Sequence, residues 1–180
     1  MIFQFRQHGF GLLLVLMQTL SSAGIAWADQ PARVGRLSYL SGAVSFAPAG
    51  VDRWVSATLN YPLTTGDRLW TDTGARTELH VGSTAIRMDH RTELDILNLN
   101  DNTLQLRLPQ GTVSIGLQAF DESQHFEVDT PTVAVVLLRP GQYRVDVDDR
   151  DTSARVTVLG GAASVTSSSR SCPSSRPARR

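Results

Sequence analysis

The chain has no lysine: all 17 of its basic side chains other than histidine are arginine. This excludes Schiff-base chemistry, a phosphate-loop lysine and a Ser-Lys dyad. The one cysteine, Cys172, lies near the C-terminus, so the body of the chain has no internal disulfide. After residue 28 there is no amphipathic helical pattern and no apolar run long enough to span a membrane. The sequence therefore offers little reactive chemistry and favours β-structure.

Charge is balanced overall but unevenly distributed. Residues 29–166 contain all 17 acidic side chains and 12 arginines, whereas residues 167–180 contain four arginines and no acid. A mildly acidic body argues against nucleic acid as a partner, because phosphate binding requires a basic face.

Residues 1–28 have the pattern of a secretory signal peptide. A charged start precedes the apolar run Gly9–Leu20, and the small residues Ala26 and Ala28 flank Trp27 before Asp29. We expect cleavage after Ala28, a periplasmic or secreted mature chain, and no stable membrane span after cleavage. An uncleaved membrane anchor is the alternative, but the apolar run is short for a span.

A short unit, usually Gly-x-apolar-x-apolar, recurs along the chain. Glycine can adopt the left-handed backbone of a tight turn, and alternating residues after it place one side-chain row on each face of a strand. Each copy therefore predicts a turn that starts a half-buried strand. The glycines that we expect at structural turns are Gly42, Gly66, Gly82, Gly111, Gly141 and Gly161.

Alternation of apolar and polar residues continues between these units. It is clear in residues 77–81, 92–96 and 103–108 and predicts strands with one buried and one wet face. The sequence Asn98–Asn102 predicts a hairpin loop, because Asn and Asp tolerate left-handed backbone. The continuous apolar run Val133–Leu138 predicts a central strand covered on both faces. The fold class expected is all-β: a single domain of short antiparallel strands, solenoid-like or sandwich-like.

The composition changes after Val165. Residues 167–180 are rich in Ser, Arg and Pro and have no large apolar side chain, which predicts a disordered tail. Two origins remain open: a natural tail, or a truncated or out-of-frame ending that leaves the last strand without a neighbour. The expected organisation is thus a signal peptide at 1–28, a β domain at 29–166 and a tail at 167–180.

The stretch Pro62–Ile86 resembles the FecR domain family of bacterial envelope proteins. It has Gly-Asp, a threonine before a short turn, an alternating strand, and then glycine with an apolar pair. The glycine unit at Gly111, the stretch Phe126–Pro131 and the later glycine units fit the following segments in order. The resemblance extends over about Val34–Val165.

The resemblance implies an all-β periplasmic domain. Named members of that family sit in the inner membrane and relay the state of an iron-siderophore receptor to a sigma factor. They carry a cytoplasmic helical segment and a membrane span before the domain. Here the signal-peptide pattern leads directly into the domain, so the chain is similar instead to secreted, stand-alone FecR-domain proteins.

No residues form a recognisable catalytic or metal motif. His80 and His90 are ten residues apart without a short-spaced partner ligand, and His125 is also isolated. The acidic run Asp146–Asp151 lacks the glycine and terminal glutamate of an EF-hand loop, which favours a solvated hairpin turn. We therefore expect no catalytic residue, no metal site and no cofactor.

Four further residues have two possible roles each. Asp67 and Asp72 could form a carboxylate pair, but their neighbouring glycines favour turn capping. Trp54 and Trp70 are expected as core anchors, with a carbohydrate platform as the alternative.

The function expected is a non-enzymatic, exported FecR-like binding module of the bacterial envelope, in signalling or protein–protein interaction. Its partner would be an unidentified envelope protein or a missing C-terminal region, bound at strand edges. The alternative is a structural envelope component that self-associates through its open end strands.

Overall fold

A computed structural model describes residues 33–119, 121, 123–148, 150 and 153–167. All of them belong to the second of two units into which the chain divides, Pro31–Arg180. The expected signal peptide and its cleavage site, Cys172, and the tail beyond Ser167 lie outside the described residues. Ser167 itself ends the last strand. No helix able to span a membrane occurs in the described part of the chain.

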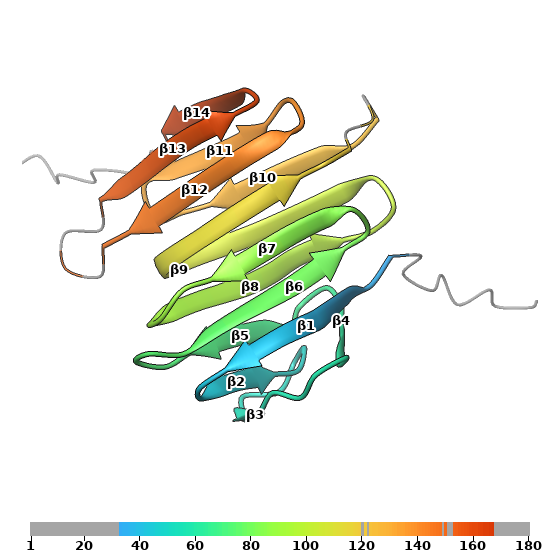
Figure 1. The fold of residues 1–180 in the computed structure, drawn as a ribbon, viewed down its shortest axis with the longest axis vertical. Coiled ribbons are helices and arrows are strands. Elements are labelled where there is room, and N and C mark those ends of the chain that lie inside the picture. Colours follow the sequence, from blue (N-terminus) through green and yellow to red (C-terminus); the bar gives the residue numbers. More distant parts are fainter. Residues whose placement is uncertain (1–32, 120, 122, 149, 151–152, 168–180) are drawn as a thin grey trace, which may run out of the picture. The chain divides into compact units, whose positions relative to one another are not determined.

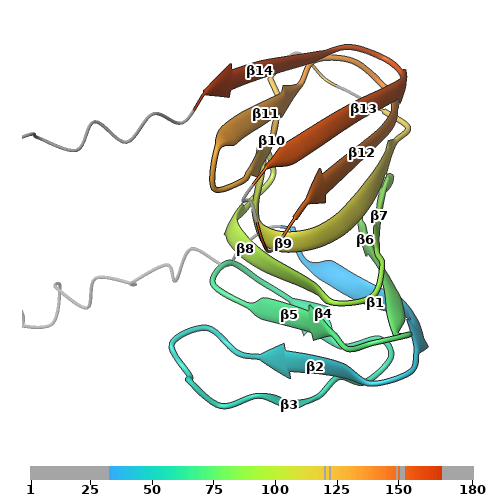
Figure 2. The same cartoon turned by 90° about the vertical axis from the view of Figure 1, so that its left-hand side faces the viewer.

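The described residues form an all-β structure, as the alternation predicts. Fourteen strands make one continuous hydrogen-bonded sheet that curls so that two halves face each other (Figures 1 and 2). We name these halves sheet A and sheet B. Sheet A contains β1 (Gly35–Ser41), β4 (Pro62–Leu63), β6 (Arg76–Val81), β7 (Thr84–Met88), the second part of β9 (Thr103–Leu117), β12 (Gly141–Val147) and β13 (Ala154–Gly160). Sheet B contains β2 (Val44–Ala47), β3 (Val55–Ser56), β5 (Arg68–Thr71), β8 (Thr92–Leu99), the first part of β9, β10 (His125–Asp129), β11 (Val133–Leu137) and β14 (Ala163–Ser167).

Neighbouring strands are antiparallel except for one pair. β10 runs parallel to the first part of β9, with His125 opposite Thr103. This arises because β9 passes from sheet B into sheet A and the chain then returns to sheet B beside its own starting point. A parallel pair needs such a crossover connection.

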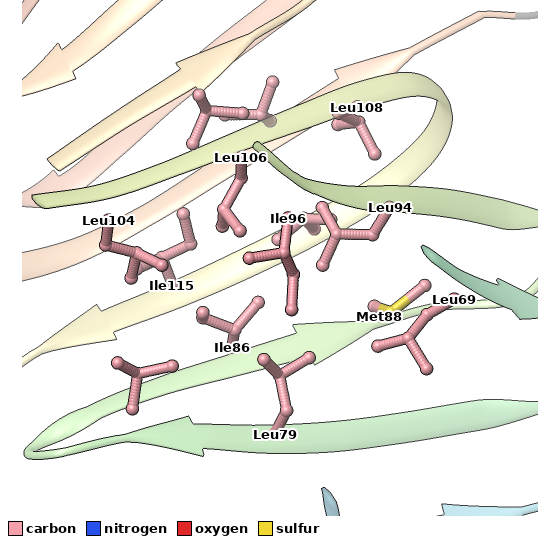
Figure 3. Close-up of a cluster of buried hydrophobic side chains, with 14 of the residues drawn as sticks. Leu69, Leu79, Ile86, Met88, Leu94, Ile96, Leu104, Leu106, Leu108 and Ile115 are labelled. Atoms are coloured by element: carbon pink, nitrogen blue, oxygen red, sulfur yellow. The ribbon is translucent and has the colours of Figure 1, made fainter. Parts of the chain in front are cut away.

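The core lies between the two sheets and is mainly aliphatic. Alternate residues of each strand point inward, so leucine, isoleucine and valine rows from the two sheets meet. Figure 3 shows side chains of this cluster. Fully buried examples are Leu69, Leu79, Ile86, Leu94, Leu106 and Leu108.

β9 joins the two sheets and bends at Gly111. The residues before it pair with β8 and β10, and those after it pair with β7 and β12. Gly111 has φ +92°, and a Cβ there would lie 2.4 Å from Thr92 Oγ1 and 2.5 Å from Thr92 Cα. Glycine is therefore required at this corner both by the backbone angle and by the lack of space.

Threonines satisfy the backbone around this corner. Thr92 Oγ1 accepts a hydrogen bond from the Thr112 N–H (2.9 Å), and Thr71 Oγ1 accepts one from the Thr92 N–H (3.0 Å). Thr71 and Thr92 are fully buried. Buried amides that the ladder leaves free are costly unless they find such partners.

The hairpins form where the turn residues predict them. β8 and β9 are joined by Asn100–Asn102, and Asn100 Oδ1 accepts from the Thr103 N–H (2.8 Å). β12 and β13 are joined through the acidic run. Ser83 occupies the two-residue turn between β6 and β7; a strand rather than a helix follows it.

Two glycines differ from the expectation that each starts a strand from a left-handed turn. Gly111 lies inside β9 and bends that strand instead of preceding it. Gly141 begins β12 with an ordinary φ, and its constraint is space, because a Cβ would lie 2.0 Å from Gly160 O. The other four have positive φ: Gly42, Gly66, Gly82 and Gly161.

The apolar run Val133–Leu138 is covered on one face only, which corrects the expectation of a doubly buried strand. β11 lies between β10 and β14, and its Val135 and Leu137 are buried, but Ala134 and Val136 are half-buried. The reason is that sheet B has a second layer, sheet A, only on its inner side.

Gly111→Ala should destabilise the protein far more than Gly74→Ala. Both glycines have positive φ, but a Cβ at Gly74 meets nothing within 4 Å. We expect a loss of about 1 kcal/mol for Gly74→Ala from backbone strain alone, and more than about 3 kcal/mol for Gly111→Ala. Urea unfolding measures both. Equal losses would show that β9 is not held against Thr92 at the corner.

Candidate functional site

His80 lies on β6, His125 lies on β10, and His90 lies in the turn between β7 and β8; each contacts a carboxylate near it in sequence. His80 Nε2 is 2.5 Å from Glu78 Oε1, and His125 Nε2 is 2.6 Å from Glu127 Oε2. His90 contacts the carboxylate of the preceding residue. Among the described residues, no three potential ligands converge on a metal position.

The described acids of the β12–β13 hairpin are held by hydrogen bonds of the hairpin and its neighbour. Asp146 accepts from Arg144 Nε (2.9 Å) and from Thr112 Oγ1 (2.8 Å), and Asp148 Oδ1 accepts from the Arg150 N–H (2.8 Å). Asp149 and Asp151 lie outside the described residues. The described acids of this run thus stabilise the turn and the neighbouring strands.

Asp67 and Asp72 both cap turns. Asp67 is only 4% exposed; its two carboxylate oxygens accept from the backbone N–H groups of Ala49 (2.9 Å) and Thr64 (2.8 Å). Asp72 Oδ1 accepts from the Thr73 N–H (2.7 Å). Asp67 therefore does more than cap its own turn, because it also ties the loop after β2 to the start of β5.

The tryptophans are not core anchors. Trp54 is 40% exposed, with the Arg68 guanidinium 5.3 Å from its ring centroid, and Trp70 is half-buried on β5. Both lie outside the buried cluster, whose side chains are mostly aliphatic. Trp70 follows the inward-pointing Leu69 on β5 and so lies on the opposite face, and Trp54 lies in the segment before β3.

The outer face of sheet B carries a row of charges of alternating sign. Arg68 lies opposite Asp95, Asp95 opposite Arg107, and Arg107 opposite Asp129 on four neighbouring strands. Asp95 is largely buried; its Oδ2 is 3.9 Å from Arg107, and its Oδ1 has no hydrogen-bond partner in the described structure. Burial raises the pKa of Asp95, against the opposing influence of Arg107. The row is not a chain of ion pairs, because Arg68 pairs with Asp52 and Asp129 accepts a hydrogen bond from Gln105. It presents no group arranged for catalysis.

The end formed by β13 and β14 is open. Val156 and Val158 lie opposite the buried Val145 and Tyr143, so they point toward the core side of sheet A. Val165 lies opposite the buried Val135 and points toward the core side of sheet B. Yet Val158 is 44% exposed and Val165 51% exposed. Core-facing side chains are thus left uncovered, because in the described structure no strand pairs with the outer edge of β13 or β14.

The opposite end is closed by the chain itself. Its edge strands, β3 and β4, have two residues each, and the segment between them returns across the edge of β1 and β2. The Asn60 N–H bonds Leu37 O (2.8 Å), and the Ala57 N–H bonds Val44 O (2.9 Å). Several apolar side chains are exposed there, but little strand edge remains free. The exposed ones are Val51, Trp54, Val55, Leu59 and Tyr61.

Tyr143 fixes the crossover between β13 and β14. Its side chain is buried, and its hydroxyl bonds Arg139 O and accepts from the Ala162 N–H (3.1 Å). Gly161, with φ +94°, allows this approach, because a Cβ there would lie 2.1 Å from the tyrosine hydroxyl. The open edges are therefore held in place within the monomer.

Comparison with known proteins identifies the family of this chain. The family model described as FecR protein matches residues 67–164, more than half of the chain. The chain belongs to the FecR family. No curated protein and no solved structure matches it.

The family match covers β5 to β13 and the first residues of β14, but not β1 to β4. It begins at Asp67, just before β5, and ends at Ser164, within β14. Strands β1 to β4 precede it, and they extend both sheets, since β1 pairs with β6 and β2 with β5. The chain thus adds strands at one end of the FecR domain, and the described residues add none beyond β14 at the other.

Sequence reasoning missed Tyr143 and the charge row. Tyr143 had a readable signal, because a tyrosine at an inward position of an alternating strand needs a hydroxyl partner. The charge row had none: Asp95 and Arg107 are outward residues on separate strands, and their alignment depends on the register between β8 and β9.

Tyr143→Phe should destabilise the β13–β14 end. It leaves the Ala162 N–H without its partner, at a cost of about 1–2 kcal/mol. We expect the amides of residues 160–166 to exchange hydrogen faster than in the wild type, while those of β6 and β7 change much less. Unchanged exchange in β14 would show that Tyr143 does not hold the crossover.

Asp95→Asn should stabilise the protein at neutral pH, whereas Glu78→Gln should destabilise it. Asp95 has a raised pKa, so its ionised form is penalised in the folded state at any pH above that pKa. The pKa of Glu78 is lowered, chiefly by the hydrogen bond to His80, and its contribution is lost as pH falls through that pKa. Each change should be of order 0.5–1 kcal/mol at pH 7.

Thermal or urea unfolding of both variants from pH 7 to pH 3 checks these signs. Both differences from the wild type should shrink toward low pH, as the carboxyl groups become protonated in folded and unfolded states alike. A loss of stability for Asp95→Asn at pH 7 would contradict the account of a poorly partnered carboxylate.

Proposed function

We propose that this protein is a non-catalytic interaction module of the bacterial cell envelope, which binds a protein partner by extending its two sheets at the β13–β14 end. Membership of the FecR family supports an envelope or signalling role. The single observation that carries the binding mode is the pair of core-facing valines, Val158 and Val165, that remain exposed on adjacent edge strands.

Free strand edges recruit other strands. Each edge presents unpaired N–H and C=O groups, and natural sheets normally protect such edges with charge, proline or bulges. β13 contains one charged residue, Arg155, and β14 contains none; neither contains proline. An added strand would gain main-chain hydrogen bonds on the edge and bury apolar side chains in the open core, which is the mode of β-augmentation.

The described site favours binding over catalysis. His80 and His125 are paired with carboxylates on their own strands, and the carboxylate of the buried Asp67 accepts hydrogen bonds from two backbone amides. Export to the periplasm is part of the proposal and rests on the sequence of residues 1–28. An exported module whose described residues form no catalytic or metal-binding cluster fits a role as a scaffold or sensor in the envelope.

Lysine at the two exposed valines tests this mode. In the double variant Val158→Lys, Val165→Lys, the charges would lie where a partner strand must bury them, and the ammonium groups stay solvated in the free protein. Val55→Lys is the matched control: Val55 is also 44% exposed and also lies on an edge strand, at the opposite end.

The measurement is capture of protein from native envelope extract by each immobilised variant. Wild type and Val55→Lys should retain the same protein, and the double variant should retain less than about a tenth as much, with all three folded by circular dichroism. Equal capture by the double variant would exclude the β13–β14 end as the binding site.

A further inference from the structure

At the open end, β13 and β14 each have one described partner strand, and their core-facing valines Val158 and Val165 are exposed. Resting on the proposed function, we infer that the partner that extends the two sheets is another molecule of this chain, related by a two-fold axis. In this dimer β13 pairs with β13 and β14 with β14, both antiparallel. The feature that carries the inference is that one axis can satisfy both edges at once.

The middle residues of the two edge strands are equally far along the chain from the crossover. Thr157 is the middle residue of β13 and Val165 is the middle residue of β14, and each lies four residues from Gly161 at the crossover. When a two-fold axis perpendicular to a sheet relates two edge strands, the strands pair antiparallel. Because the facing sheet is nearly parallel to the first, the same axis is also nearly perpendicular to it. An axis that passes by Thr157 and Val165 would therefore continue sheet A and sheet B together.

This register keeps inward side chains opposite inward side chains. Centred on Thr157, Val156 of one copy lies opposite Val158 of the other, and both point to the core side. Centred on Val165, that valine lies opposite its own counterpart. If the register shifted by one residue, an inward-pointing side chain of one copy would lie opposite an outward-pointing side chain of the other. The apolar pattern therefore excludes registers shifted by an odd number of residues. The two cores would become continuous through these valines.

The charges permit the dimer. Arg155, the one charged residue of β13, lies opposite Leu159 in this register, so the two arginines are at opposite ends of the strand pair. Leu159 is 72% exposed in the monomer. No like charges face each other across either edge, and such pairs are what natural edges use to prevent association.

Head-to-tail stacking fits the structure less well. It would place β13 and β14 against β3 and β4, which offer two residues each, while Asn60 and Ala57 already use part of the backbone there. Such a contact would also repeat without end, whereas the two-fold contact closes at two copies. The mass of the assembly in solution therefore distinguishes the two-fold dimer from a head-to-tail stack.

The first experiment is sedimentation equilibrium of the purified mature chain in reducing buffer over a wide range of concentration. We expect a monomer–dimer equilibrium that stops at the dimer. The double variant Val158→Lys, Val165→Lys should raise the dimer dissociation constant by at least about 100-fold, and Val55→Lys by less than about threefold. A monomer at all concentrations, growth beyond the dimer, or equal weakening by Val55→Lys would overturn the inference.

The second experiment tests the register. In a Cys172→Ser background, Thr157→Cys places two thiols on the axis, and opposite residues of antiparallel strands have Cβ atoms about 4.5–5.5 Å apart. Mild oxidation should convert most of this variant to a disulfide-linked dimer. Ser56→Cys, on the edge strand of the opposite end, is the control and should cross-link much more slowly; equal rates would contradict the pairing of β13 with itself.

The outcomes separate this inference from the proposed function. If the chain is monomeric alone but captures a different protein through Val158 and Val165, the interaction module stands and the second-copy partner is wrong. If the valine variants change neither mass nor capture, the edge-binding function is wrong as well.

Discussion

The bend of β9 at Gly111 is the constraint on which the rest of the structure depends. Because this one strand supplies a partner edge to β8 and β10 in one sheet and to β7 and β12 in the other, it sets how the sheets face each other. The corner has no room for a side chain, and buried threonines take up the backbone groups around it. The inward rows of both sheets meet as a result, and the core forms between them.

The two ends of this sandwich are unlike. At one end, β1 to β4 lie outside the FecR match, extend both sheets, and finish in two-residue strands crossed by their own connecting segment. At the other end, the crossover at Gly161 and Tyr143 joins two longer strands, one at the edge of each facing sheet, with core-facing valines uncovered. The same alternation that builds the core thus leaves core-facing valines exposed on two strands whose outer edges have no described partner. We propose that the edges of β13 and β14 are where the protein acts.

The sequence predicts the faces and turns of this fold better than its pairings. Alternation identifies which residues of β6 or β8 point inward, and the Asn-rich loop identifies the β8–β9 hairpin, because both signals are local. The parallel pairing of β9 with β10 and the tie from Asp67 to Ala49 depend on distant segments, and no local pattern encodes them. The tryptophans and Val133–Leu138 mislead for a related reason: apolar character indicates a preference for burial, but the fold provides only one buried face per sheet.

Hydrogen exchange measured strand by strand, in dilute and in concentrated solutions of the mature chain, tests the central claim most directly. Edge amides of β13 and β14 exchange freely when unpaired and become protected when another strand pairs with them. Protection of residues 154–167 should rise with concentration while that of β3 and β4 stays constant. Protection that is independent of concentration in β13 and β14, or that rises at β3 and β4 instead, would contradict it.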